Sequence, residues 1–192
     1  YLISRQFLSN LRVSGFISSD IMQGNLSIGV RKDWQILAGI FQKIIDSITQ
    51  EEFLALQKKW LGDFQTSALK EGMESGTPSF SMTEKKVALT PEEQAFIREH
   101  EGPIIAGAET DWPPFDFVED GKPTGYSNDL LRLAAKKAAL PLEFVFGFTW
   151  AELLEKFRNG KIDILPAVYK LPERTREMAF TKDYGANPSV LV

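Results

Sequence analysis

Two short segments carry the residues best suited to hold a small ligand. The first, residues 109–115, places Glu109 near Trp112 and Phe115, with Pro113 and Pro114 between the two rings. The prolines stiffen the backbone and hold the rings in fixed directions, so little entropy is lost when a ligand contacts them. This segment predicts the aromatic wall of a binding pocket. The alternative is that one or both rings fill the core.

The second segment, residues 169–174, runs from Tyr169 to Arg174. Pro172 and Glu173 are typical of the first turn of a helix, which places Arg174 at a helix N-terminus just after a predicted strand. The planar guanidinium offers paired donors that match the two oxygens of a carboxylate, which lysine cannot do. The segment therefore predicts a carboxylate site. Alternatively, Arg174 pairs with Glu177 or another acid on its own helix.

Enzymatic chemistry is the competing possibility. Glu109, Asp111 and Asp116 could act as paired carboxylates in glycoside cleavage, although such an acidic loop is also typical of a solvated surface. The chain has no cysteine and a single histidine, His100. This composition argues against thiol chemistry, a histidine-based zinc site and a Ser-His-Asp triad. We therefore predict no catalytic residue, no metal site and no cofactor.

The composition is that of a globular protein. The 192 residues are 43% hydrophobic and 25% charged, and the formal net charge of −4 gives no electrostatic reason to bind nucleic acid. No apolar stretch approaches the roughly 18 residues of a membrane-spanning helix, and no signal peptide opens the chain. Because the sequence starts at Tyr1 and ends within a strand-like segment, we interpret it as a piece of a longer protein.

The C-terminal half alternates strands with helices. The pattern predicts strands at 104–108, 142–145 and 162–165, separated by helices at 128–139 and 150–158. Such alternation indicates an α/β fold with a mostly parallel sheet flanked by helices. Ligands of these sheets bind beyond the carboxyl ends of the strands, where both ligand-suited segments lie.

The N-terminal half begins with an alternating strand at 26–30 and an amphipathic helix over 33–48, with Asp33 as its N-cap. Thr49 and Glu52 form a predicted capping box that opens a second helix. A segment rich in Gly, Ser and Pro, 67–88, indicates a linker, and Thr90 starts a further helix.

Residues 104–192 resemble the first lobe of a bacterial extracellular solute-binding protein of the polar-amino-acid type, which has the two-lobed, periplasmic-binding-protein-like Venus-flytrap fold. The resemblance rests on motifs in a fixed order: Trp112-Pro-Pro-Phe115, Gly121-Lys-Pro-Thr-Gly-Tyr126 with Asp129-Leu130, Trp150 with Leu153-Leu154, Asn159-Gly-Lys-Ile-Asp163, Pro172-Glu-Arg174, and Phe180-Thr181 with Tyr184.

The start of the chain is similar to the end of another such module. The strand at 26–30 and the helix pair closing on Lys59-Trp60-Leu61-Gly62 carry this similarity. It implies three parts: 1–66 as the C-terminal part of a first module, 67–101 as linker and connecting helix, and 102–192 as the first lobe of a second module. This order resembles the tandem sensor regions of bacterial sensor histidine kinases.

The resemblance implies a periplasmic ligand-sensing region of a membrane-anchored receptor, whose parent is a histidine kinase or a diguanylate cyclase. It implies that Arg174 clamps the carboxylate of a small carboxylate or amino-acid ligand, that Trp112 and Trp150 form aromatic walls, and that Glu109 meets a ligand amine. Tyr169 is common in the sensor branch. Amino-acid-binding members usually carry hydroxyls near Ala167, Tyr169 and Leu171, so the chain departs from that pattern here.

Other expectations stay open at this point. The chain could instead be a periplasmic receptor of a transporter or the non-catalytic module of a cell-wall lytic enzyme. The apolar face of the helix at 33–48 needs a partner, since exposing it would forfeit roughly 1.5–3 kcal/mol for each large side chain. We expect it to pack on the sheet of residues 104–165, within one chain or by exchange in a homodimer.

Overall fold

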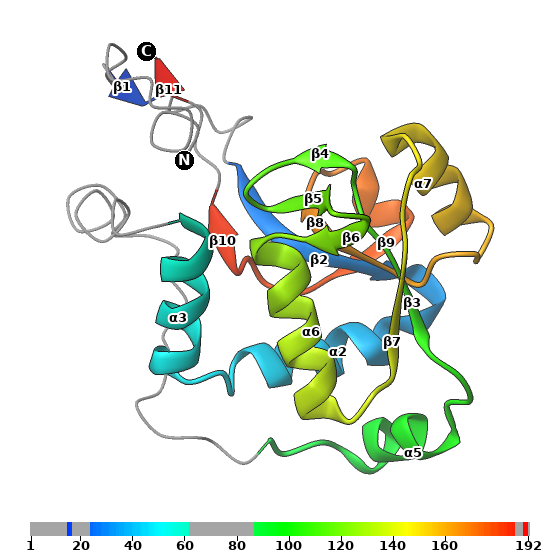
Figure 1. Ribbon diagram of the computed structural model, residues 1–192. Helices are drawn as coiled ribbons and strands as arrows, with labels where there is room; N and C mark the ends of the chain where they lie inside the picture. Colours follow the sequence, from blue (N-terminus) through cyan, green and yellow to red (C-terminus); the bar gives the residue numbers. More distant parts are fainter. Residues whose placement is uncertain (1–14, 17–23, 62–86, 187–189, 192) are drawn as a thin grey trace.

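The computed structural model describes residues 15–16, 24–61, 87–186 and 190–191. Its centre is a six-stranded sheet in the order β10-β2-β8-β3-β7, with β9 also paired to β2 (Figure 1). Strands β8, β3 and β7 are parallel, whereas β2 runs antiparallel to β8. The predicted α/β fold is confirmed. The strands are β2 (Asn25–Arg31), β3 (Ile104–Gly107), β7 (Leu142–Val145), β8 (Ile164–Tyr169), β9 (Met178–Phe180) and β10 (Gly185–Ala186).

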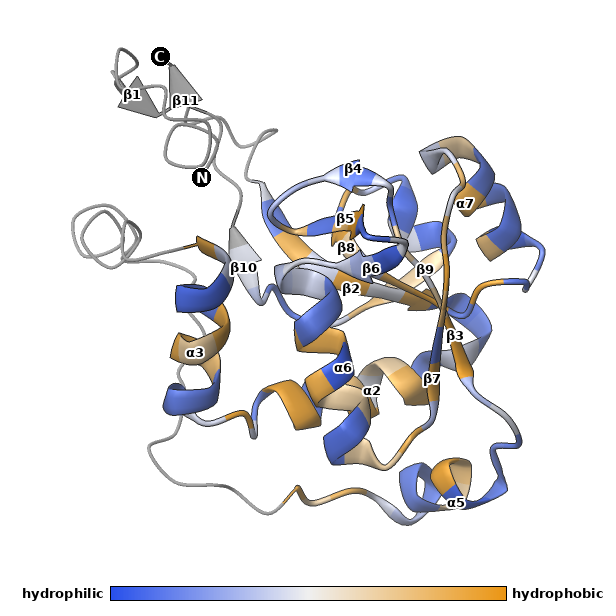
Figure 2. Ribbon diagram, in the orientation of Figure 1, coloured by the Kyte–Doolittle hydropathy of each residue, from blue (hydrophilic) through white to orange (hydrophobic). Residues whose placement is uncertain are grey.

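Helices cover both faces of this sheet. Side chains of β3 alternate between the two faces: Ile104 and Ala106 join the larger core cluster, and Ile105 packs against the cluster of Leu153 and Phe157. Figure 2 shows hydrophobic residues (orange) on the central strands and alternating hydrophobic and hydrophilic residues along α3, α6 and α7. The helices are α2 (Gln35–Ile45), α3 (Gln50–Leu61), α5 (Pro91–Glu99), α6 (Tyr126–Ala138) and α7 (Trp150–Arg158). In the described ranges, none is long and apolar enough to cross a membrane.

Residues 24–61 share the sheet and the core of the C-terminal half. Strand β2 pairs with β8 on one side and with β9 and β10 on the other. The apolar face of α2, including Leu37 and Phe41, is buried in the same cluster as Ile104. Helix α2 therefore packs on this sheet within one chain, where its direct neighbours are strands β2 and β9 and helix α6. The division into parts of two modules stays a prediction, because it concerns the origin of segments that here form one lobe.

Most of the helix starts predicted from local sequence agree with the structure. Capping boxes at Thr49 and Thr90 open α3 and α5, as predicted. The prediction of Asp33 as an N-cap is wrong, because a 3-10 helix, η1 (Lys32–Trp34), precedes α2 and the Asp33 carboxylate pairs with Arg31 at 2.6 Å. Most of the predicted linker at 67–88 lies outside the described residues. A two-residue pair, β1 (Gly15–Phe16) with β11 (Val190–Leu191), stands apart from the main sheet.

Candidate functional site

A small antiparallel sheet holds the aromatic segment beside the carboxyl end of β3. It consists of β4 (Asp111–Trp112), β5 (Asp116–Glu119) and β6 (Lys122–Thr124). Between β4 and β5 the chain turns through a cis Pro113–Pro114 bond. Gly125 ends the small sheet at φ 118°, and a Cβ there would lie 2.4 Å from the Phe115 carbonyl oxygen. Only glycine permits this close backbone approach, which helps to fix the loop carrying Trp112.

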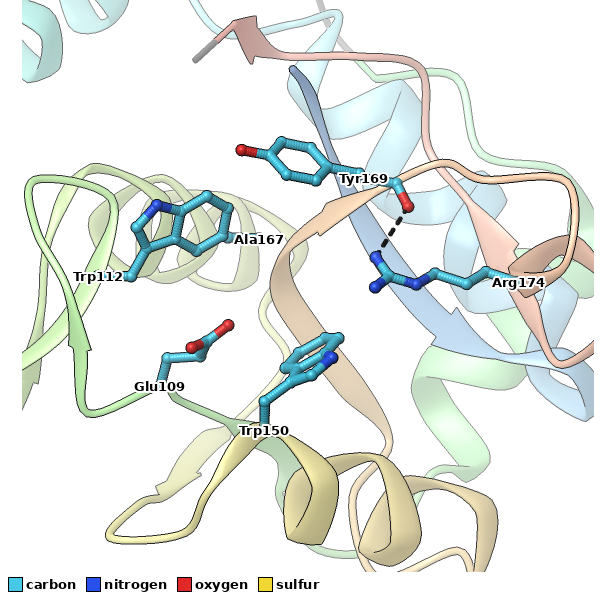
Figure 3. A pocket seen from close by; sticks show the side chains of 6 residues that line it. All are labelled: Glu109, Trp112, Trp150, Ala167, Tyr169 and Arg174. Atoms are coloured by element: carbon cyan, nitrogen blue, oxygen red, sulfur yellow. Dashed lines mark hydrogen bonds between the residues drawn. The ribbon is translucent and has the colours of Figure 1, made fainter. Parts of the chain in front are cut away.

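A cleft of about 290 Å³ opens at the carboxyl ends of β3 and β8. Figure 3 shows side chains from separate elements converging on it. The loop after β3, strand β4, helix α7, strand β8 and the turn after β8 all contribute. Five of the six predicted site residues line the cleft, together with Ala167: Glu109, Trp112, Trp150, Tyr169 and Arg174.

Phe115 is the predicted site residue that does not line the cleft. Its side chain is 5% exposed and belongs to the main core cluster. Its ring lies 5.8 Å from that of Trp112 and 6.4 Å from that of Tyr126, measured between centroids. The core alternative is therefore correct for Phe115, which supports Trp112 from within the core instead of facing a ligand.

Arg174 lines the cleft, but it lies in a different element from the predicted one. It is the first residue of a three-residue 3-10 helix, η2 (Arg174–Arg176), so the expected α-helix N-terminus is absent at this described turn. Its Nη1 donates a hydrogen bond to the Tyr169 carbonyl oxygen at 3.2 Å, and the guanidinium carbon lies 5.2 Å from the Trp150 ring centroid. Pairing with Glu177 is also wrong, because that carboxylate binds Arg158 at 2.9 Å.

Two oppositely charged side chains, Glu109 and Arg174, face the cleft without forming an ion pair with each other. Burial raises the pKa of the Glu109 carboxyl, against the opposing effect of Arg174. Burial likewise lowers the pKa of Arg174, against the effects of Glu173 and Glu109. Within the described part of the chain, neither Glu109 nor Arg174 forms an ion pair. The cleft thus presents one carboxylate and one guanidinium to a ligand.

The rest of the lining is apolar and aromatic. Ala167, 3% exposed, supplies a methyl group where a hydroxyl residue would offer a hydrogen bond. Trp112 and Tyr169 touch edge to face, with 5.5 Å between their centroids. A bound molecule would therefore gain contact area from three rings and directional bonds from the two charged groups. No group of metal-ligating side chains occurs among the residues that the structure describes.

The buried environment of Asp116 could not be predicted from the sequence. Its side chain is 1% exposed, and Asn128 Nδ2 donates a hydrogen bond to Asp116 Oδ1 at 2.8 Å. Burial raises the pKa of Asp116 to about 7, although hydrogen bonds from the Glu109 amide and Asn128 oppose the rise. Asp111, by contrast, is exposed. The three acids of this loop therefore occupy different environments, and only Glu109 lines the cleft.

The raised pKa of Asp116 predicts that the folded chain loses stability as pH rises from about 4 to about 7. In this window the folded carboxyl keeps a proton that the unfolded chain releases. We expect the Asp116 carboxyl alone to make the free energy of unfolding about 2 kcal/mol higher at pH 5 than at pH 7.5. Urea denaturation at both pH values measures the difference, which should shrink by that amount in Asp116→Asn. An equally large difference in the variant would contradict the assignment.

Comparison with known proteins places these features in context. Residues 104–192 match the family model of bacterial extracellular solute-binding proteins, family 3. The whole chain aligns with virulence sensor protein BvgS of Bordetella pertussis (26% identity over 194 residues) and with sensor protein EvgS of Escherichia coli K12 (23% over 193 residues). It spans only 14% and 15% of the lengths of these two relatives.

Two further similarities cover parts of the chain. A probable histidine-binding protein of Campylobacter jejuni is 33% identical over 82 residues, which are 42% of this chain and 32% of that protein. Among solved structures, the Ancestral Cationic Amino Acid Solute Binding Protein AncCDT-1 is 29% identical, with a TM-score of 0.37, over 43% of this chain and 36% of that chain.

Proposed function

Because residues 104–192 belong to the bacterial extracellular solute-binding proteins of family 3, we propose that the chain is a ligand-sensing region of a membrane-anchored bacterial receptor. The alignments with two sensor proteins support this assignment, since they run through residues 62–102 into both flanking halves. A transport receptor would not account for similarity across that join. The proposed receptor is a two-component sensor kinase, and this region lies in the periplasm.

The ligand that we propose is a small zwitterion, such as an amino acid. The unpaired charges of Glu109 and Arg174 in one cleft carry this proposal. Arg174 would hold the ligand carboxylate, and Glu109 would meet its ammonium group, with Trp112 and Trp150 against its apolar part. A binding site of this kind requires no chemical step. The histidine-binding relative supports an amino acid as the ligand class.

Signalling would follow from closure of a second lobe over this cleft. A ligand shifts such an equilibrium only by its differential affinity for the closed form. The cleft lies at the edge of the described lobe, so the ligand can bind here first and contact the opposing lobe on closure. Arg174 and Glu109 would supply the contacts on this side of the closed form.

Titration calorimetry on the 192-residue chain tests the ligand class. The probes are matched pairs: histidine with imidazolepropionate, glutamate with glutarate, alanine with propionate, and lysine with 6-aminohexanoate. Within each pair only the α-amine differs. We expect at least one amino acid to bind, and to bind more tightly than its counterpart. If no pair binds, or if both members bind equally, the proposed ligand class is wrong.

A further inference from the structure

The described lining of the cleft contains two charged side chains. Glu109 and Arg174 carry these charges, and the other four lining residues are three aromatic residues and one alanine. If the two charges hold the ammonium and the carboxylate of a zwitterion, this lining offers no opposite charge to a charged ligand side chain. Moving such a side chain out of water then costs free energy without compensation. The cleft therefore disfavours ligands with a charged side chain.

The Ala167 side of the cleft is apolar, and the backbone groups beside it already have partners. Ala167 contributes a methyl group, and the residue before it, Pro166, has no N–H to donate. The Pro166 carbonyl oxygen accepts a hydrogen bond at 2.7 Å from the hydroxyl of Tyr184, a fully buried residue. The Tyr169 carbonyl oxygen accepts a bond from Arg174 Nη1 at 3.2 Å. Both carbonyl groups are thus bonded within the lobe.

Three partly exposed rings surround the remaining space (Figure 3). Trp112 and Tyr169 meet edge to face with 5.5 Å between centroids, and the Trp150 centroid lies 5.2 Å from the guanidinium carbon of Arg174. A further ring placed among them gains edge-to-face or offset contacts that an alkyl chain does not make. The cleft volume of about 290 Å³ lies near the lower end of the roughly 300–1,000 Å³ typical of small-molecule sites, which suits a ligand with one ring.

We propose that the ligand is an amino acid with an uncharged aromatic side chain, such as phenylalanine, and that Tyr169 is a specificity-determining residue for its ring. This inference rests on the proposed function and narrows its ligand class. The Tyr169 side chain lines the cleft, whereas its backbone carbonyl oxygen holds Arg174. Because a side-chain substitution keeps that carbonyl group, recognition of the ring can be separated from binding of the carboxylate.

Calorimetry on the 192-residue chain measures this preference with phenylalanine, alanine, lysine and glutamate. We expect phenylalanine to bind at least tenfold more tightly than each of the other three, because a buried ring adds apolar contact and a charged side chain loses hydration. The amine-free counterpart of phenylalanine, 3-phenylpropionate, should bind more weakly than phenylalanine because it has no ammonium group for Glu109 to meet.

Variants of Tyr169 test the role of its ring. In Tyr169→Ala, the ratio of the phenylalanine affinity to the alanine affinity should fall about fivefold, the value of one lost ring contact. Tyr169→Phe keeps the ring and should retain this ratio. If Tyr169→Ala does not fold, Tyr169→Leu gives the same comparison, because leucine keeps apolar bulk without a ring.

Phe146→Ala is the matched control outside the cleft. Phe146 follows β7, is 39% exposed and does not line the cleft. The ratio of the phenylalanine affinity to the alanine affinity should therefore stay within about twofold of that of the unmodified chain. A loss as large as that in Tyr169→Ala would show a general effect of removing an exposed ring and would overturn the role of Tyr169.

Other outcomes separate this inference from the proposed function. If alanine, lysine or glutamate binds as tightly as phenylalanine, the aromatic ligand class is wrong and the proposed function stands. If phenylalanine is preferred and the Tyr169 variants without a ring keep the full preference, the role of Tyr169 is wrong. If 3-phenylpropionate binds as tightly as phenylalanine, the proposed zwitterion is wrong, whereas the preference for a ring stands. If none of these probes binds, both proposals fail.

Discussion

Replacing Arg174 by alanine is expected to weaken binding of the carboxylate ligand at least tenfold. The variant removes a guanidinium that faces the cleft and is held by the Tyr169 carbonyl oxygen and the Trp150 ring. Hydrogen bonds to charged groups contribute about 1.5–3 kcal/mol each, and 1.4 kcal/mol corresponds to a tenfold change in affinity. Calorimetry with the tightest-binding probe measures the loss. Both members of its matched pair should be affected.

Arg176→Ala is the matched control. It removes the same charge from the same 3-10 helix, but Arg176 is exposed and does not line the cleft. The affinity of this variant for the same probe should stay within about twofold of that of the unmodified chain, because exposed charges away from the ligand are screened by water and salt. Similar losses in both variants would indicate a general charge effect and contradict a specific clamp at Arg174.

The second large effect concerns the core. Phe41→Ala in α2 is expected to reduce the free energy of unfolding by about 3–5 kcal/mol, the usual cost of emptying a buried phenylalanine site. Phe41 is fully buried in the cluster that also contains Ile104 and Ile164. Since the free energy of unfolding of a domain is only about 5–15 kcal/mol, this loss is large for the whole lobe. Urea denaturation followed by circular dichroism gives the value.

The neighbouring Ile36 offers a control on the same helix. Its side chain is 43% exposed, so Ile36→Ala should change the stability by about 0.5 kcal/mol or less. Hydrogen exchange adds the decisive comparison: in Phe41→Ala, amides of β3 and β8 should lose protection together with those of α2. If β3 and β8 kept full protection while α2 lost it, residues 24–61 would not share a cooperative core with the C-terminal half.

Local patterns predicted the elements that depend on neighbours in sequence. The strand Leu142–Val145 and the helix Trp150–Arg158 have the predicted bounds, because a strong period and a nearby capping residue define them. The strand expected at 162–165 is instead Ile164–Tyr169, with its end set by pairing to β2. Such pairing joins residues more than a hundred positions apart, which a local pattern does not encode.

The site was partly predictable, because residue type indicates which side chains suit the lining of a binding cleft. Glu109, Trp112, Trp150, Tyr169 and Arg174 converge on one cleft, as their places after strands or at helix starts suggested. Phe115 was not distinguishable from Trp112, because an aromatic ring suits both a pocket wall and a core. The burial of Asp116 had no local signal either, since it follows from the packing of α6 against the small sheet.

The indole N–H signals of the four tryptophans provide the most direct test of the central claim, that the cleft between Trp112 and Trp150 binds a small zwitterion. Trp34 packs against Phe96 and His100, and Trp60 donates its indole N–H to Asp129 at 2.9 Å, so these two serve as internal references. On titration with the amino-acid probes, nitrogen-15 spectra should show saturable shifts at Trp112 and Trp150 with Trp34 and Trp60 unmoved. Unchanged signals at Trp112 and Trp150 with every probe would contradict the account.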